Sequence, residues 1–251
     1  MVWIVLGENK GKVELISTKK DGLLPKGTFL TAEDGEDKYV LRVDNSSQIQ
    51  TYRPSPMVVE MELPPIIADQ KCQNVLTTYR VKNITKRKDG LIPFIKPQTK
   101  ARLSTQEEID IALGIKKEDK GPKVFIASMY ANQNQHLMDE SGNFITAKIP
   151  EDMFYHQTLV CGKTGSGKTV SLKYLAQYFI EEIGGAVLAV NVKDSDLLKM
   201  NDKSNVISES VKKEWETLNE EPHGIDNFMV YYPANSEIIK SKKIDPEYCE
   251  R

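Results

Sequence analysis

The sequence predicts an α/β protein that carries a phosphate-binding loop in its second half, preceded by a small antiparallel β domain. Three observations lead to this fold class: a complete glycine-rich loop at residues 162–169, a strand-like segment before it with an amphipathic helix after it, and short β-rich segments over the first hundred residues. The 251 residues suffice for two modest domains, which we expect to span residues 1–103 and 104–251.

The N-terminal part is predicted to be a small antiparallel barrel or sandwich. Its strand-like segments are short, rich in β-forming residues and separated by turn residues such as Asp34 and Gly35. They are Val2–Leu6, Lys12–Ser17, Thr28–Thr31, Tyr39–Val43 and Val58–Leu63.

A basic stretch follows, in which nine cationic side chains stand against the single carboxylate of Asp89. The nine are Lys71, Arg80, Lys82, Lys86, Arg87, Lys88, Lys96, Lys100 and Arg102. This stretch could contact phosphates, or it could be a solvated face that acidic neighbours balance. The sequence leaves both interpretations open.

A short helix and a hairpin are expected between the two parts. Ser104 and Glu107 have capping-box spacing at the start of the helix, and Gly114 ends it. The segment from 135 to 149 contains Asp139–Gly142, which has the composition of a turn between two short arms.

The phosphate loop is the strongest functional signal in the chain. Its glycines allow backbone conformations in which successive N–H groups converge on one anion. Lys168 supplies a positive charge for the β- and γ-phosphates of ATP, and Thr169 offers a hydroxyl to Mg²⁺. The predicted cofactor-binding residues are Gly162, Lys163, Thr164, Gly165, Ser166, Gly167, Lys168 and Thr169. The alternative is a glycine-rich turn that binds no ligand.

The flanks give the loop the strand–loop–helix context that the motif needs. Gln157–Cys161 is expected to be a strand, Thr169–Ile183 a helix that packs one face on a sheet, and Ala186–Val190 a second core strand. An exposed helix is expected at Ser210–Leu218 and a further core strand at Phe228–Tyr232.

Polar residues follow the second predicted core strand. They lie at its carboxyl end, where open α/β sheets bind ligands, although a role in closing a polar loop is equally open. They are Asn191, Lys193, Asp194 and Asp196.

Composition adds few constraints on function. Charge is balanced, with 34 basic and 36 acidic side chains, and no run of 18 apolar residues is present, so we expect a cytoplasmic protein with no membrane partner. Three widely spaced cysteines form no metal-binding pattern, and reduced thiols are the expectation.

The chain from Thr105 onward resembles the HerA-like branch of the FtsK–HerA superfamily of DNA-pumping ATPases. Three segments carry the resemblance: Glu107–Gly114, Ile149–Thr169 with its TGSGKT loop, and Ala189–Leu198 with the sequence AVNVKDSDLL. The resemblance implies a RecA-like P-loop core, here truncated, behind a small β-barrel. It also implies ATP and Mg²⁺ as cofactors, double-stranded DNA as substrate, a homo-hexamer and a possible nuclease partner. His156 would be a hinge or interface residue, or simply a packed side chain.

The chain departs from that family in one respect. No apolar strand ending in Asp-Glu, the Walker B segment that such motors need, follows Thr169, and the only arginine after Arg102 is Arg251. The catalytic residues therefore stay unknown, and we expect this chain to be the N-terminal part of a longer protein. The main alternative is an interaction module that binds ATP without hydrolysing it. A small P-loop kinase or GTPase lacks support, because no lid or guanine-recognition motif is visible.

Overall fold

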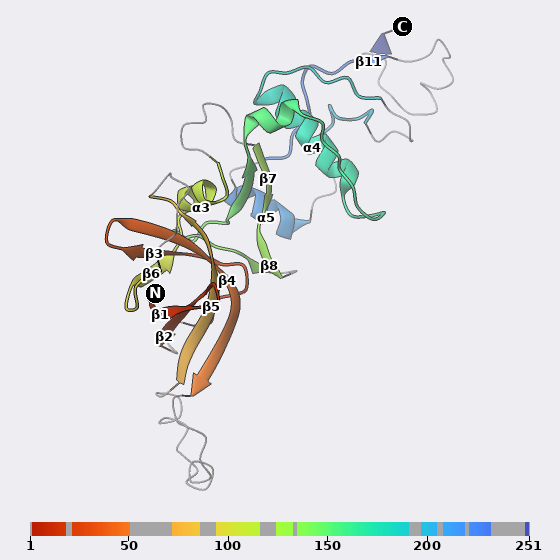
Figure 1. The fold of residues 1–251 in the computed structure, drawn as a ribbon. Helices are drawn as coiled ribbons and strands as arrows, with labels where there is room; N and C mark the ends of the chain where they lie inside the picture. The colour runs from red at the N-terminus through yellow and green to blue at the C-terminus, as the bar shows by residue number, and fades with distance from the viewer. Residues whose placement is uncertain are drawn as a thin grey trace. The chain divides into compact units, whose positions relative to one another are not determined.

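The structure is a computed structural model that describes residues 2–18, 22–50, 72–85, 94–115, 124–132, 135–190, 197–204, 208–218, 221–231 and 249–250 (Figure 1). The chain divides into two compact units. Unit 1 comprises residues 1–120 and 125–149, and unit 2 comprises residues 121–124 and 150–251. Each unit is described by itself. In the described part of the chain, no helix is long and apolar enough to cross a membrane.

Unit 1 is built on a closed six-stranded barrel in which every pairing is antiparallel (Figure 1). The strand order around the barrel is β1-β2-β5-β4-β3-β6. The strands are β1 (Trp3–Asn9), β2 (Lys12–Thr18), β3 (Phe29–Asp34), β4 (Asp37–Gln50), β5 (Cys72–Asn83) and β6 (Lys100–Leu103). The antiparallel barrel predicted from the sequence is therefore confirmed. The segment Val58–Leu63, also predicted as a strand, lies outside the described residues.

Alternate residues of the strands fill the barrel, as the two-residue period of a strand requires. Trp3 and Val5 of β1 are fully buried, and Leu30 and Ala32 of β3 are buried as well. The remaining members of this core are Val13, Leu15, Leu24, Tyr39, Leu41, Val43, Leu76, Ile95 and Ala101. One contiguous core inside the barrel accounts for the stability of this part of unit 1.

Helix α3 (Gln106–Ala112) covers one outer face of the barrel. Phe29 and Val40, which do not belong to the barrel's interior cluster, are buried with Ile109 of α3 and with Leu137 and Ile145 from the segment that follows. This second core joins α3 and the hairpin to the barrel, and it explains why unit 1 extends to residue 149.

The capping box of α3 lies one residue later than the sequence predicted. The N-cap is Thr105, whose hydroxyl accepts from the Glu108 N–H, and the Glu108 carboxylate accepts from the Thr105 N–H at 3.0 Å. Ser104 cannot serve as the cap because its buried hydroxyl bonds Thr31 of the barrel, 2.9 Å away. The prediction that assigned the box to Ser104 and Glu107 was wrong by one position.

The rest of unit 1 is a set of short paired strands. β7 (Val124–Ser128) pairs with β10 (Thr146–Ile149), and β8 (Tyr130–Asn132) pairs with β9 (Gln135–His136). The predicted hairpin turn is present, since the Asp139 carboxylate accepts from the N–H groups of Ser141 and Asn143 at 2.9 and 2.8 Å.

Unit 2 contains a 3₁₀ helix, η2 (Glu151–Tyr155), the helices α4 (Lys168–Glu181) and α5 (Glu209–Thr217), and a short parallel pair of strands. The pair is formed by β11 (Val230–Tyr231) and β12 (Cys249–Glu250). The helices predicted at 169–183 and 210–218 are confirmed within two residues. The predicted core strand at Phe228–Tyr232 is reduced to β11.

The two strands predicted beside the phosphate loop are not formed in the part of the chain that the structure describes. There, residues 157–161 and 186–190 have no strand pairing, and they are mostly exposed, with Leu159 and Leu188 each 87% exposed. A strand exists only when a neighbour completes its hydrogen bonds, and the described residues provide none for these segments. No side chain of α4 is fully buried either, so the described residues do not form the sheet of a RecA-like core.

Candidate phosphate-binding loop

The loop at 162–169 has the backbone of an anion-binding turn that opens into a helix. Gly165 and Gly167 have φ angles of 81° and 85°, a region that glycine alone enters readily. The Ser166 N–H bonds the Lys163 carbonyl at 3.1 Å, which closes the turn. Gly167 is the N-cap of α4 and has no side chain to bond the first helical N–H groups. Those groups therefore stay available to a bound anion.

Gly162 allows a close approach inside the loop. A Cβ atom at this position would lie 2.5 Å from the Ser166 hydroxyl oxygen and 3.6 Å from Cγ of Lys168. The start of the loop therefore lies against its end, and a side chain here would require Ser166 to move. The glycine identities at 162, 165 and 167 each have a structural reason.

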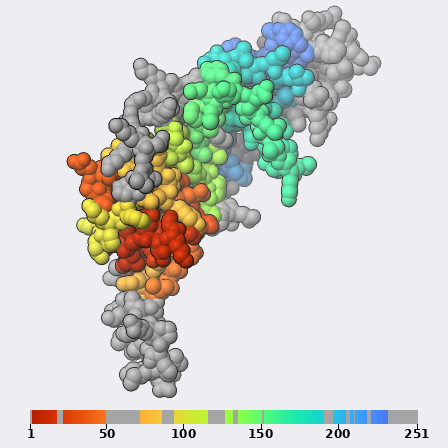
Figure 2. Space-filling view, viewed as in Figure 1, coloured from red at the N-terminus to blue at the C-terminus, as the bar shows by residue number. Residues whose placement is uncertain are grey.

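The Lys168 side chain folds back over the loop. Its ammonium donates to the Lys163 carbonyl at 2.7 Å, and it is the one partly buried residue of the eight. Thr169, in the first turn of α4, is exposed. The Lys168 ammonium thus lies where the loop backbone turns. A phosphate ligand can reach this ammonium, and a metal ion bound to that ligand can reach the Thr169 hydroxyl. Figure 2 shows this part of the chain, coloured green to cyan, at the molecular surface.

The far end of α4 contacts the segment that precedes Ile225. Nε2 of His223 lies 2.9 Å from the Glu181 carboxylate, and Nδ1 lies 2.8 Å from the Glu221 carbonyl. The Ile225 N–H bonds the Met200 carbonyl at 2.9 Å, and Ile225 is buried. The loop helix is therefore held at its C-terminal end by residues some forty positions later in the chain.

Several predicted site residues are not brought to the loop by the described structure. Asn191, Lys193, Asp194 and Asp196 lie outside the described residues. His156 is exposed, so the interpretation of it as a packed side chain was wrong. Of the predicted site residues, only the eight of the loop lie together in the part of the chain that the structure describes.

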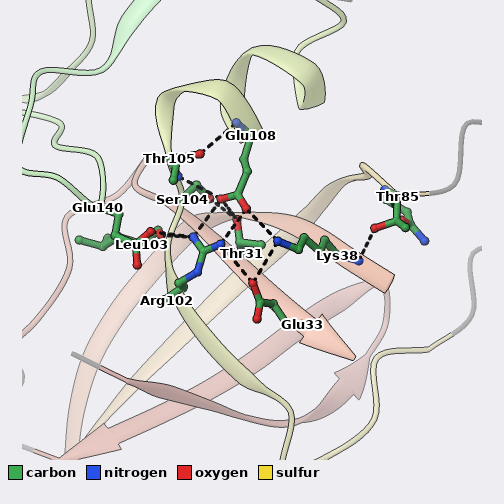
Figure 3. Close-up of polar contacts among 11 residues, drawn as sticks. Thr31, Glu33, Lys38, Thr85, Arg102, Leu103, Ser104, Thr105, Glu108 and Glu140 are labelled. Atoms are coloured by element: carbon green, nitrogen blue, oxygen red, sulfur yellow. Dashed lines mark hydrogen bonds and ion pairs between the residues drawn. The ribbon is translucent and has the colours of Figure 1, made fainter. Parts of the chain in front are cut away.

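The described members of the basic stretch are largely paired with carboxylates. Arg80 lies 3.0 Å from Glu8, and Lys96 lies 3.5 Å from Asp34. Arg102 contacts three glutamates (Figure 3). For these residues, the pairings favour the interpretation that acidic neighbours balance the basic stretch. Lys71, Lys86, Arg87, Lys88 and Asp89 lie outside the described residues.

Arg102 and Glu108 form the centre of a polar cluster between the barrel and α3 (Figure 3). Burial acts to raise the pKa of Glu108, but hydrogen bonds from Arg102, the Thr105 amide and Thr31 together lower that pKa below its ordinary value. The hydrogen bond to Glu108 in turn raises the pKa of Arg102. No pattern in the sequence marked this cluster, because Thr31, Glu33 and Glu140 are far from Arg102 and Glu108 in the chain.

A second charged cluster lies at the surface of the barrel. Asp44 accepts from Lys12 at 2.9 Å and from Lys26 at 3.1 Å. The hydrogen bonds from Lys12 and Lys26 lower the pKa of Asp44 to about 2. Lys26 and Asp44 also line an open pocket of about 370 Å³, with Leu23, Leu24, Pro25, Asn45, Ser46 and Gln135.

Comparison with known families places the loop in context. Residues 135–232 match the family model described as the HerA-like helicase C-terminal domain. The match contains the phosphate loop and the segment 189–198, whereas Glu107–Gly114 lies outside it and remains a prediction. No curated protein matches the chain. Proteins of the matched family are generally ATPases and helicases. Residues 135–232 therefore match the HerA-like helicase model, and the resemblance seen in the sequence is confirmed over this part of the chain.

Proposed function

We propose that the chain is the ATP-binding subunit of a HerA-like hexameric translocase or helicase, in which ATP hydrolysis drives the movement of double-stranded DNA. The observation that carries the proposal is the loop at 162–169, whose glycine conformations and helix N-terminus suit a polyphosphate. The family match to residues 135–232 supports the DNA-directed activity. Such a protein would work in the cytoplasm and would act together with a nuclease partner.

The loop residues would divide the binding of Mg²⁺-ATP among them. The backbone N–H groups of 163–168 would surround the phosphates, Lys168 would neutralise their charge, and Thr169 would provide one oxygen ligand to Mg²⁺. Bound Mg²⁺ would supply charge stabilisation during phosphoryl transfer. Residues 1–103 would act as the β-barrel domain, and residues 104–251 would contribute to a RecA-like P-loop core.

The alternative is an interaction module that binds ATP and uses it to control assembly with a partner. The glycine conformations and the helix N-terminus of the loop favour it as much as they favour the motor, because they account for phosphate binding and not for turnover. This alternative keeps every role of the loop residues and removes only turnover.

Hydrolysis assays separate the two. ATP turnover would be measured with and without double-stranded DNA for the protein and for Lys168→Ala. Turnover that DNA stimulates and that the substitution abolishes supports the motor. ATP binding without turnover, with or without DNA, supports the interaction module. Absence of ATP binding contradicts both.

A further inference from the structure

Aromatic side chains connect the segment before the phosphate loop to the far end of the loop helix. The Phe154 ring of η2 is parallel to the Phe179 ring of α4, with 6.1 Å between centroids and 4° between planes. Tyr155 meets Phe179 edge-on at 6.2 Å, and Phe154 also lies 6.2 Å from the Tyr178 ring. These separations lie within the range in which aromatic pairs attract each other.

The positions of these rings constrain the path of the chain around the loop. From Lys168 to Phe179, α4 rises about 16 Å at about 1.5 Å per residue. The extended segment from Tyr155 to Gly162 can span about 23 Å at about 3.3 Å per residue. Because Tyr155 contacts Phe179 near the C-terminal end of α4, the segment from Tyr155 to Gly162 must run back along α4 to the N-terminal end of the helix. The loop can then cross the N-terminus of α4 even though no strand among the described residues pairs with this segment.

Gly185 leaves the space that the Phe179 ring occupies. A Cβ atom on Gly185 would overlap Cε1 of the Phe179 ring and would lie 2.6 Å from Cδ1, which is closer than any real contact. The Gly185 N–H also bonds the Phe179 carbonyl at 3.0 Å. The φ angle of Gly185 is not positive, so alanine would suit its backbone and would fail only for lack of space.

We propose that Phe154, Tyr155, Phe179 and Gly185 form an aromatic clasp that positions the phosphate loop for its nucleotide. This inference rests on the proposed function, because it assigns a role to the clasp in ATP binding by that loop. The clasp residues are positioning residues that do not touch the ligand. They lower the conformational freedom that the loop would otherwise lose when ATP binds, and a preorganised loop binds more tightly.

The test compares single and double substitutions. Phe179→Ala removes the ring, and Gly185→Ala displaces it; each is expected to weaken ATP binding about tenfold in calorimetric titration. The double variant is expected to bind no more weakly than Phe179→Ala alone, because the alanine at 185 then meets no ring. Leu172→Ala, at a position of α4 that is 48% exposed, serves as the control and should bind like the wild type.

Hydrogen exchange without nucleotide provides a readout that does not depend on ATP. The amides of 162–167 should exchange faster in both single variants, while barrel amides exchange at the wild-type rate. ATP binding by both single variants with wild-type affinity would overturn the inference, as would additive effects in the double variant. If the wild type itself does not bind ATP, the proposed function fails. Exchange rates of the loop would then show separately whether the clasp orders it.

Discussion

The Arg102 guanidinium donates to both carboxylate oxygens of Glu108, at 2.8 Å from Nη2 and 3.0 Å from Nη1. The Glu108 side chain is only 10% exposed, and the same carboxylate caps α3. Arg102 also reaches Glu33 of β3 and Glu140 of the hairpin turn. One arginine therefore joins the barrel, α3 and the hairpin.

Replacing Arg102 with methionine should destabilise unit 1 by about 2 kcal/mol, because it leaves the Glu108 carboxylate, which is mostly buried, without its arginine partner. Urea unfolding would measure this change. Lys96→Ala is the matched control: the Lys96 side chain is 80% exposed in its pair with Asp34, and pairs with so exposed a partner contribute at most about 1 kcal/mol. Equal effects of the two substitutions would show that the contacts of Arg102 contribute no more to stability than the Lys96–Asp34 pair does.

The pH dependence of stability should contain a contribution from Glu108. Its pKa is lower in the folded protein than the ordinary 4.5, so its stabilisation is complete above that pH and is lost as the pH falls. Glu108→Gln should therefore be less stable than the wild type at pH 7, with a difference that shrinks below about pH 4.5. Melting temperatures between pH 3 and pH 7 test this. A difference that stays constant with pH would refute the assignment.

Gly167→Ala should weaken ATP binding about tenfold, because an alanine at a φ of 85° costs about 1 to 2 kcal/mol. The structural reason is local, since Gly167 is the N-cap of α4. Calorimetric titration gives the affinity, and the unfolding of the barrel should not change. A variant that binds ATP as well as the wild type would mean that ATP does not require this loop conformation.

Thr169→Ala should remove the increase in ATP affinity that Mg²⁺ causes, while the affinity without Mg²⁺ stays the same. The hydroxyl of Thr169 is the proposed protein ligand to the metal, and alanine provides no oxygen. Thr169→Ser keeps the hydroxyl and should keep the Mg²⁺ effect. Titrations with ATP in EDTA and in Mg²⁺ distinguish these cases; an equal Mg²⁺ effect in all three proteins would exclude Thr169 as a ligand.

The sequence indicated the barrel but not all of its strands. β5 was not recognised because only one of its four buried residues, Leu76, is apolar; Asn74 and Thr78 are polar, so the apolar alternation of a strand is missing. Their polar groups are satisfied by bonds to the Gly22 and Val13 carbonyls at 2.8 and 2.9 Å. Buried polar residues of this kind become interpretable only when their partners, distant in sequence, are known.

The candidate site was predictable where it depends on local chemistry. The glycine loop and α4 follow from adjacent residues, whereas strand formation by 157–161 and 186–190 depends on neighbouring strands that the sequence of the segments cannot supply. The cap at Thr105 shows the same limit, because the barrel engages the Ser104 hydroxyl. The aromatic clasp could not be predicted, since Phe154 and Gly185 lie on either side of the loop and meet only through Phe179.

ATP titration of the wild type, Lys168→Ala and Lys163→Ala tests the central claim most directly. Lys168 would place its charge on the phosphates, and a charged hydrogen bond of this kind is worth about 1.5 to 3 kcal/mol, so its loss should weaken binding about ten- to a hundredfold. Lys163 contributes its backbone carbonyl to the loop, and its exposed side chain should be replaceable with little effect. Equal affinities of all three proteins, or no binding by the wild type, would contradict the assignment of this loop as an ATP site.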